Sequence, residues 1–305
     1  MSFRELWLDL LKVPENYSYT PFLQLKKRYS FQECDAELYI QANGPGTVQR
    51  VLKAFPKVIH GKLPAVATPF YFPERMMGFD PETGEILERY TPIAMMSHLA
   101  KRGFMTISAD AYHLTYLSLD LDRENCTRWK LVGNALHHDH PRWCGMGKLL
   151  ADTRLLLDAL EMDDRVDRDR IGIAGHSLGG KMAFYAGCLD PRVKAVLVSD
   201  FGFVWEKSNW EDVWYYGERL AEMKKAGLDH SQILDFGEGK PFLLLAGEDD
   251  DEESYALMRK ASSYRKNPKN LHFVHHASGH RPPPEVLSKG YDFLEQSLRG
   301  KSEKP

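Results

Sequence analysis

The feature that most constrains the fold is a five-residue turn, Gly175-His176-Ser177-Leu178-Gly179. The apolar run before it, 171–174, is typical of a buried strand, and the run after it, 181–186, is typical of a helix. A serine at such a turn has a strained backbone that only small neighbours permit, which accounts for the flanking glycines. A plain glycine-rich turn is the alternative. We interpret Ser177 as a nucleophile and the Leu178 N–H, at the positive end of the helix, as a donor to an oxyanion.

The rest of the chain alternates between strand-like and helix-like segments. Strands are predicted at 65–71, 104–108, 193–199, 242–246 and 271–275, and helices at 92–101, 146–160, 212–225, 252–265 and 284–298. A hairpin is predicted from strands at 36–41 and 47–53 around a turn at 43–46. Repeated strand–helix units favour an α/β fold with a mostly parallel sheet covered by helices on both faces.

The domain organisation predicted from this pattern is a single domain over 1–305. Residues 1–35 form an N-terminal helical extension that opens with a short amphipathic helix, and 300–305 form a flexible tail. The amphipathic helix packs on the body, covers the cleft or joins a second copy, so a homo-oligomer is one expectation.

Composition and charge exclude several classes of function. The net charge of −3 leaves no basic surplus for nucleic acid, and no apolar run is long enough for a bilayer. The amino terminus lacks the apolar core of a signal peptide, and the four cysteines lack C-x-x-C spacing. We expect a cytoplasmic enzyme that acts on a small molecule and needs no cofactor or metal.

A nucleophilic serine needs a histidine base, and the histidine needs a carboxylate that holds its tautomer. His280 follows the last predicted strand on a loop at the catalytic edge of the sheet, with His275 and His276 as alternatives. For the acid, the strand 242–246 ends in the carboxylate run 247–251. Asp250 is favoured in this run, because in hydrolases with such a serine turn the acid usually stands three residues after the turn glycine, as Gly-x-x-Asp. Asp249 is the second choice. Asp200, after the strand 193–199, is the competitor.

These residues carry a resemblance to a known family. The stretches 167–172, 189–195, 208–212 and 279–281, together with the turn at Ser177, are similar to the dienelactone hydrolase and acetyl xylan esterase branch of the α/β-hydrolase superfamily. The resemblance implies ester hydrolysis through an acyl-enzyme on Ser177, with short acyl esters of carbohydrates or other small alcohols as substrates. Thioester, amide or lactone hydrolysis with the same residues is the alternative, and a non-catalytic binding protein of this fold is another.

The chain departs from that branch at the segment expected to supply the second oxyanion donor. Where relatives carry His-Gly, the sequence reads Thr68-Pro69-Phe70-Tyr71-Phe72-Pro73. Because proline has no N–H, the donor is Phe70, Tyr71 or Phe72, and we select Tyr71.

Substrate contacts are predicted from residues at the carboxyl ends of strands. They are Phe72, His113, Trp205 and Trp210, and for the tryptophans helix packing is an alternative. The run 137–140, His-His-Asp-His, is interpreted as a solvated loop rather than a metal site.

Overall fold

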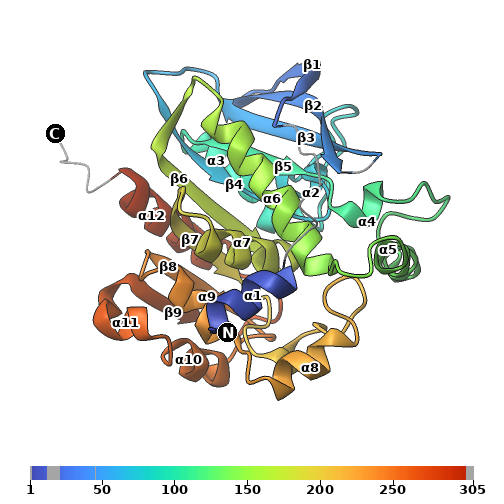
Figure 1. The fold of residues 1–305 in the computed structure, drawn as a ribbon. Coiled ribbons are helices and arrows are strands. Elements are labelled where there is room, and N and C mark those ends of the chain that lie inside the picture. Colours follow the sequence, from blue (N-terminus) through green and yellow to red (C-terminus); the bar gives the residue numbers. More distant parts are fainter. Residues whose placement is uncertain (1, 12–20, 45, 300–305) are drawn as a thin grey trace.

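A single sheet runs through the computed structural model, which describes residues 2–11, 21–44 and 46–299 (Figure 1). Within these residues the strand order is β1-β2-β3-β5-β4-β6-β7-β8-β9. The first three strands and the β3–β5 pair are antiparallel, whereas β5, β4, β6, β7, β8 and β9 are mutually parallel. The strands are β1 (Gln24–Ser30), β2 (Cys34–Gly44), β3 (Thr47–Pro56), β4 (Leu63–Ala67), β5 (Met105–Ala109), β6 (Val166–His176), β7 (Val193–Ser199), β8 (Phe242–Ala246) and β9 (Leu271–His275).

Helices connect the parallel strands and cover both faces of the sheet. The α-helices are α1 (Phe3–Leu11), α2 (Pro73–Met77), α3 (Met95–Lys101), α4 (Tyr112–Thr115), α5 (Cys126–Asp139), α6 (Gly145–Glu161), α7 (Leu178–Leu189), α8 (Arg219–Lys225), α9 (His230–Phe236), α10 (Glu252–Met258), α11 (Ser262–Lys266) and α12 (Pro284–Arg299). Three short 3-10 turns are η1 (Thr91–Ile93), η2 (Trp205–Lys207) and η3 (Pro268–Asn270).

The core consists of two apolar layers, one on each face of the sheet. Along β6, Ile171 and Ile173 pack into the layer under α6 and α7, whereas Ala174 belongs to the layer under α3 and α12. Alternate side chains of a strand point to opposite faces, so both faces of a central strand must be apolar. This explains the near-continuous apolar runs that predicted these strands.

The predicted α/β architecture is confirmed, including the hairpin of β2 and β3 and the helix over the first dozen residues. Of the helical extension predicted over 1–35, Phe3–Leu11 is helical, but Gln24–Ser30 is a strand paired with β2, which corrects the prediction there. Exposed on nearly all positions, this strand gives no alternating pattern. The predicted tail, 300–305, lies outside the described residues.

Two further segments differ from the predictions. Of the helix predicted over 212–225, only Arg219–Lys225 is helical. The residues before it form turns whose aromatic side chains, Trp214, Tyr215 and Tyr216, are buried. The histidine run 137–140, predicted as a loop, forms the last turn of α5 and its C-cap. Among the described residues, no helix is both long and apolar enough to cross a membrane.

Candidate active site

Ser177 occupies a sharp turn between a strand and a helix. β6 ends at His176 and α7 starts at Leu178, and the serine between them has φ 54° and ψ −120°. Such a backbone is strained for any residue with a Cβ atom and persists only where its surroundings enforce it. The Ser177 N–H donates to the Ser199 carbonyl at 2.9 Å, which ties the turn to β7. The structure therefore has the backbone that raises a serine hydroxyl above the sheet edge.

Gly179 shows why the turn needs its second glycine. A Cβ atom at this position would lie 2.1 Å from the Pro69 carbonyl oxygen. The segment after β4 therefore lies directly against the first turn of α7, which no larger residue at 179 permits. This brings the segment expected to supply the second oxyanion donor next to the serine.

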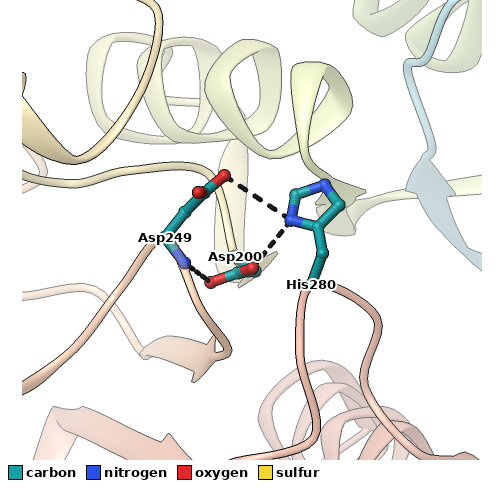
Figure 2. Close-up of side chains that lie close together, drawn as sticks. All are labelled: Asp200, Asp249 and His280. Atoms are coloured by element: carbon teal, nitrogen blue, oxygen red, sulfur yellow. Dashed lines mark hydrogen bonds and ion pairs between the residues drawn. The ribbon is translucent and has the colours of Figure 1, made fainter.

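His280 is paired with Asp200 (Figure 2). Its Nδ1 atom lies 2.7 Å from Oδ2 of Asp200, a carboxylate that is fully buried at the end of β7. The other oxygen of Asp200 accepts from the N–H groups of Gly247 and Asp249, at 2.8 and 3.0 Å. Asp200, like Ser177, has a positive φ, 39°. Two of the four described non-glycine residues with positive φ, Ser177 and Asp200, thus belong to one site, where strain can be retained for function.

The second ring nitrogen of His280 points away from both carboxylates (Figure 2). The His280 ring also lies 4.6 Å, centroid to centroid, from the ring of His176, the residue directly before Ser177. The histidine is therefore beside the serine turn, with Nδ1 held by carboxylate and Nε2 left for proton transfer.

Charge around His280 favours its protonated form. Burial lowers the pKa of this histidine, but the hydrogen bond and charge of Asp200, with the charges of Asp249 and Glu248, raise it above the ordinary value overall. The opposite holds for His176, whose pKa burial lowers strongly, helped by the neighbouring positive charge of His280. Of these two neighbouring imidazoles, His280 is the one suited to accept a proton.

The prediction of Asp250 as the carboxylate for His280 is wrong. Its Oδ2 atom accepts from the N–H groups of Phe201 and Gly202 at 2.9 and 3.1 Å, and its Oδ1 atom accepts from the Phe203 N–H and the Ser254 hydroxyl. These bonds occupy both oxygens and hold the loop that follows Asp200. Burial raises the pKa of Asp250 to about 6. Asp250 therefore supports the residue that contacts the histidine, and Asp200, the competitor in the sequence, makes the contact.

Asp249 is a second carboxylate near the same nitrogen. Its Oδ2 atom lies 3.5 Å from Nδ1 of His280 (Figure 2), and burial together with the charge of Asp200 raises its pKa. In the part of the chain that the structure describes, Asp200, Asp249 and His280 present ligand atoms within 4.8 Å of one another, close enough for a metal ion. The short His280–Asp200 hydrogen bond already uses two of these atoms and favours an acid–base role.

The predicted oxyanion residues lie on the two segments that meet at Gly179. Leu178 is the first residue of α7. The Tyr71 carbonyl accepts from the Ala111 N–H at 2.9 Å, and its ring stacks on Trp129 at 4.6 Å. Tyr71 is therefore fixed by bonds and packing that leave its own N–H uninvolved, and its role as a donor stays a prediction.

Three of the four predicted substrate contacts are interior residues, which contradicts the prediction for them. Trp205 and Trp210 donate their indole N–H groups to the carbonyls of Leu228 and Gly202 and pack around His230. His113 is completely buried. Aromatic residues after a strand can form core as readily as cleft, and neighbours distant in sequence decide which. The guanidinium groups of Arg75 and Arg123 each lie 4.5 Å from the ring of Phe72, and the role of Phe72 in substrate binding stays a prediction.

Lys181 is a charged residue of this region that the sequence did not bring to attention. It is buried on α7, one turn after Ser177, and its Nζ atom donates to Ser208 Oγ at 2.8 Å and to Asn209 Oδ1 at 3.3 Å. Burial lowers its pKa to about 7, against the opposing effect of nearby carboxylates. Its position, four residues after Ser177 and so on the first turns of the same helix, is the sequence signal that could have identified Lys181.

The chain matches a known protein family. The model of the dienelactone hydrolase family matches residues 89–269, more than half of the chain. The protein belongs to the dienelactone hydrolase family, and its class, carboxylic ester hydrolase, agrees with the sequence-based prediction. A comparison with curated proteins finds no match.

Solved structures show the same fold at low sequence identity. A Bacteroides fragilis protein provisionally described as an acetyl xylan esterase superimposes with a TM-score of 0.72 at 18% identity, over 92% of this chain and 75% of that one. A glucuronoyl esterase from Teredinibacter turnerae superimposes with a TM-score of 0.71 at 18% sequence identity, over 96% of this chain and 83% of that one. A glucuronoyl esterase from Solibacter usitatus superimposes with a TM-score of 0.67 at 11% identity, over 94% of this chain and 87% of that one. All three confirm the α/β-hydrolase fold.

Proposed function

We propose that this protein hydrolyses carboxylic esters through an acyl-enzyme on Ser177, with His280 as the general base and Asp200 as the carboxylate that orients it. The observation that carries the proposal is the 2.7 Å contact between His280 Nδ1 and the buried Asp200, beside a serine with the backbone of a nucleophile elbow. A carboxylate on Nδ1 fixes the tautomer that leaves Nε2 free to accept the serine proton.

In the first half of the reaction, Ser177 Oγ bonds to the ester carbonyl carbon while its proton passes to Nε2 of His280. The carbonyl oxygen becomes an oxyanion, stabilised by the Leu178 N–H and, as we propose, the Tyr71 N–H. Collapse of this intermediate breaks the bond to the alcohol oxygen, which takes the proton from His280. Water then attacks the acyl-enzyme by the same route and releases the carboxylic acid.

One of the related structures is named as an acetyl xylan esterase, which supports esters of small acyl groups as the first substrates to test, and two are named as glucuronoyl esterases, which adds esters of a sugar acid. The proposed mechanism uses only the side chains and backbone groups above. A cytoplasmic location and a homo-oligomer stay predictions of the sequence.

The test is hydrolysis of p-nitrophenyl acetate by purified protein, with Ser177→Ala and, as a control, Ser262→Ala on the exposed face of α11. We expect Ser177→Ala to lose the activity and Ser262→Ala to keep it. A fluorophosphonate probe should label the unsubstituted protein and Ser262→Ala stoichiometrically. It should leave Ser177→Ala unlabelled. Equal rates for Ser177→Ala and the unsubstituted protein would refute the mechanism. Rates on matched thioesters and amides identify the preferred bond.

A further inference from the structure

Lys181 is a buried cation next to the active site that the proposed mechanism does not use. It stands on α7 one turn after Ser177, and only 2% of the residue is exposed. Taking an ammonium group out of water is costly unless hydrogen bonds and opposite charges compensate for the lost hydration. The contacts of this group therefore show what the fold gains by keeping the cation there.

The ammonium group contacts the segment that follows β7. Its Nζ atom donates to Ser208 Oγ at 2.8 Å and to Asn209 Oδ1 at 3.3 Å. The same atom lies 3.9 Å from the ring centroid of Trp210 and 4.7 Å from that of Tyr215. A protonated lysine has three N–H donors, and its charge is attracted to the face of an aromatic ring. Lys181 thus joins the catalytic helix to this segment through contacts that depend on its charge.

The contacted segment includes the loop that begins with the catalytic carboxylate. We call residues 200–210 the acid loop, because Asp200 is its first residue. A Cβ atom at Gly202 would lie 2.3 Å from Cβ of Ser208, and the Gly202 carbonyl accepts from the indole N–H of Trp210 at 2.7 Å. The two ends of the acid loop therefore lie against each other, and a group that holds one end also holds the other.

The acid loop also packs directly on α7. A Cβ atom at Gly180 would lie 2.8 Å from Cβ of Phe201 and 3.2 Å from the Ser199 carbonyl oxygen. The loop therefore leaves β7 in close contact with the helix that starts after Ser177. The side chain of Lys181, one residue after Gly180, crosses the same boundary and ties its far end.

The charges around Lys181 keep it close to its point of deprotonation. Burial lowers its pKa to about 7. Four carboxylates oppose this decrease through their charges: Asp249 and Asp250 after β8, and Glu211 and Asp212 after the acid loop. The other titratable neighbours are neutral, since burial raises the pKa of Tyr215 well above its ordinary value and lowers that of His230, on α9, to about 3. Lys181 can therefore change its charge within the pH range of an assay.

We propose that Lys181 is a positioning residue for ester hydrolysis. Its charged side chain holds the acid loop on α7, and the loop holds Asp200 on His280. The inference rests on the proposed function, because it assigns to Lys181 the orientation of that catalytic pair. A neutral lysine has two N–H donors and no attraction to the Trp210 ring. Loss of the proton therefore loosens the loop, and kcat falls while KM changes little.

The test is the pH dependence of kcat and KM on p-nitrophenyl acetate. In the unsubstituted protein, kcat should fall on an alkaline limb that lies well below the ordinary lysine pKa of about 10.4. Lys181→Met keeps the length of the side chain without the charge, and should remove the limb and lower the maximal kcat by about 10–100-fold. KM should stay within about twofold, since the loss falls on turnover. Lys225→Met, exposed on α8, is the matched control and should keep the limb.

Two changes in the acid loop test the inference without altering Lys181. Asn209→Asp places a carboxylate where the amide oxygen lies, 3.3 Å from Nζ, and should move the alkaline limb to higher pH by about 1–3 units. Ser208→Ala removes an acceptor of the ammonium group and should move the limb to lower pH. Neither side chain is fully buried, and thermal melts verify that both variants fold.

Tryptophan fluorescence follows the charge of Lys181 without turnover. Loss of a cation 3.9 Å from the Trp210 ring should change the emission with the midpoint of the alkaline limb, and Lys181→Met should lack this change. An alkaline limb that persists in Lys181→Met, or that moves in neither loop variant, would overturn the inference, and so would an active protein without the limb. Failure of the proposed function looks different: the unsubstituted protein would not hydrolyse the ester at any pH, although its fluorescence would still titrate.

Discussion

At the scale of single residues, the site is defined by what each carboxylate touches. Asp200 and Asp250 are both fully buried at neighbouring strand ends. Asp200 contacts the imidazole of His280, whereas Asp250 accepts three backbone N–H groups and one hydroxyl. The two have the same chemistry and similar burial, so their roles differ only through their hydrogen-bond partners.

Exchanging these carboxylates for amides should separate the two roles. Asp200→Asn should lower kcat on p-nitrophenyl acetate by about 10⁴-fold, because the amide no longer holds the right histidine tautomer. Asp250→Asn should instead lower the free energy of unfolding by about 1–3 kcal/mol, because one of its carboxylate oxygens becomes an NH₂ group facing N–H donors. Steady-state kinetics and urea unfolding measure the two effects. A larger fall in kcat for Asp250→Asn would contradict this assignment.

The pH dependence should report the carboxylates around His280. Only the neutral imidazole accepts the serine proton, so kcat/KM should rise with pH through the pKa of His280. The net effect of its surroundings raises this pKa, so the acid limb should lie above the ordinary histidine value of about 6.5. Asp249→Asn removes a negative charge 3.5 Å from Nδ1 and should shift the limb to lower pH. A shift to higher pH would exclude Asp249 as a neighbour of the catalytic base.

At the scale of elements, the turn between β6 and α7 keeps its backbone conformation because the segment after β4 packs directly on it. The Pro69 carbonyl occupies the space of a Cβ atom at Gly179. At Gly187, later in the same helix, the three atoms nearest to an added Cβ atom are side-chain atoms of Val196 and Ile173. Side chains can move by rotation, whereas the backbone at Pro69 is held by β4 and by the turn itself.

Alanine at these two glycines should therefore have unequal effects. Gly179→Ala should abolish esterase activity and lower the melting temperature, since the Pro69–Tyr71 segment must be displaced. Gly187→Ala should cost stability while retaining measurable activity, because the strain falls on movable side chains away from Ser177. Thermal melts and p-nitrophenyl acetate rates provide both measurements. Equal activities of the two variants would argue against the close approach of Pro69.

At the scale of the whole molecule, the amino terminus is integrated into the core. Trp7 of α1 is fully buried, stacks on Trp205 and His230, and donates its indole N–H to Gln232 of α9 at 2.8 Å. These partners come from the connections after β7, roughly two-thirds along the sequence. The helix thereby fastens the loop that follows Asp200 from the outside.

Removing this anchor should destabilise the fold as a whole. Trp7→Ala should lower the free energy of unfolding by about 3–5 kcal/mol, the usual cost of truncating a large buried aromatic residue. Phe3→Ala, on the same helix but 51% exposed, should change it by less than about 1 kcal/mol. Chemical denaturation of both variants tests the difference. Similar small losses would show that α1 contributes little to the core.

Local patterns in the sequence were sufficient for much of this structure. Parallel strands buried on both faces must be apolar throughout, so their runs and the intervening helices could be read directly. The turn around Ser177 is likewise a local steric requirement. The strand Gln24–Ser30 escaped prediction, because an exposed edge strand has no apolar side to reveal it.

The α/β class, the serine turn and the loop that carries His280 could be predicted from the sequence, since each depends on residues adjacent in the chain. The carboxylate that meets the histidine and the aromatic residues that form the core depend on how distant segments pack together. Asp200, Asp249 and Asp250 all come to one sheet edge, and the loop paths after β7 and β8 select among them. Trp205 is stacked against Trp7 of α1, from the far end of the chain, and Trp210 packs against Trp205 and His230. Such contacts join residues far apart in sequence, and no local pattern encodes them.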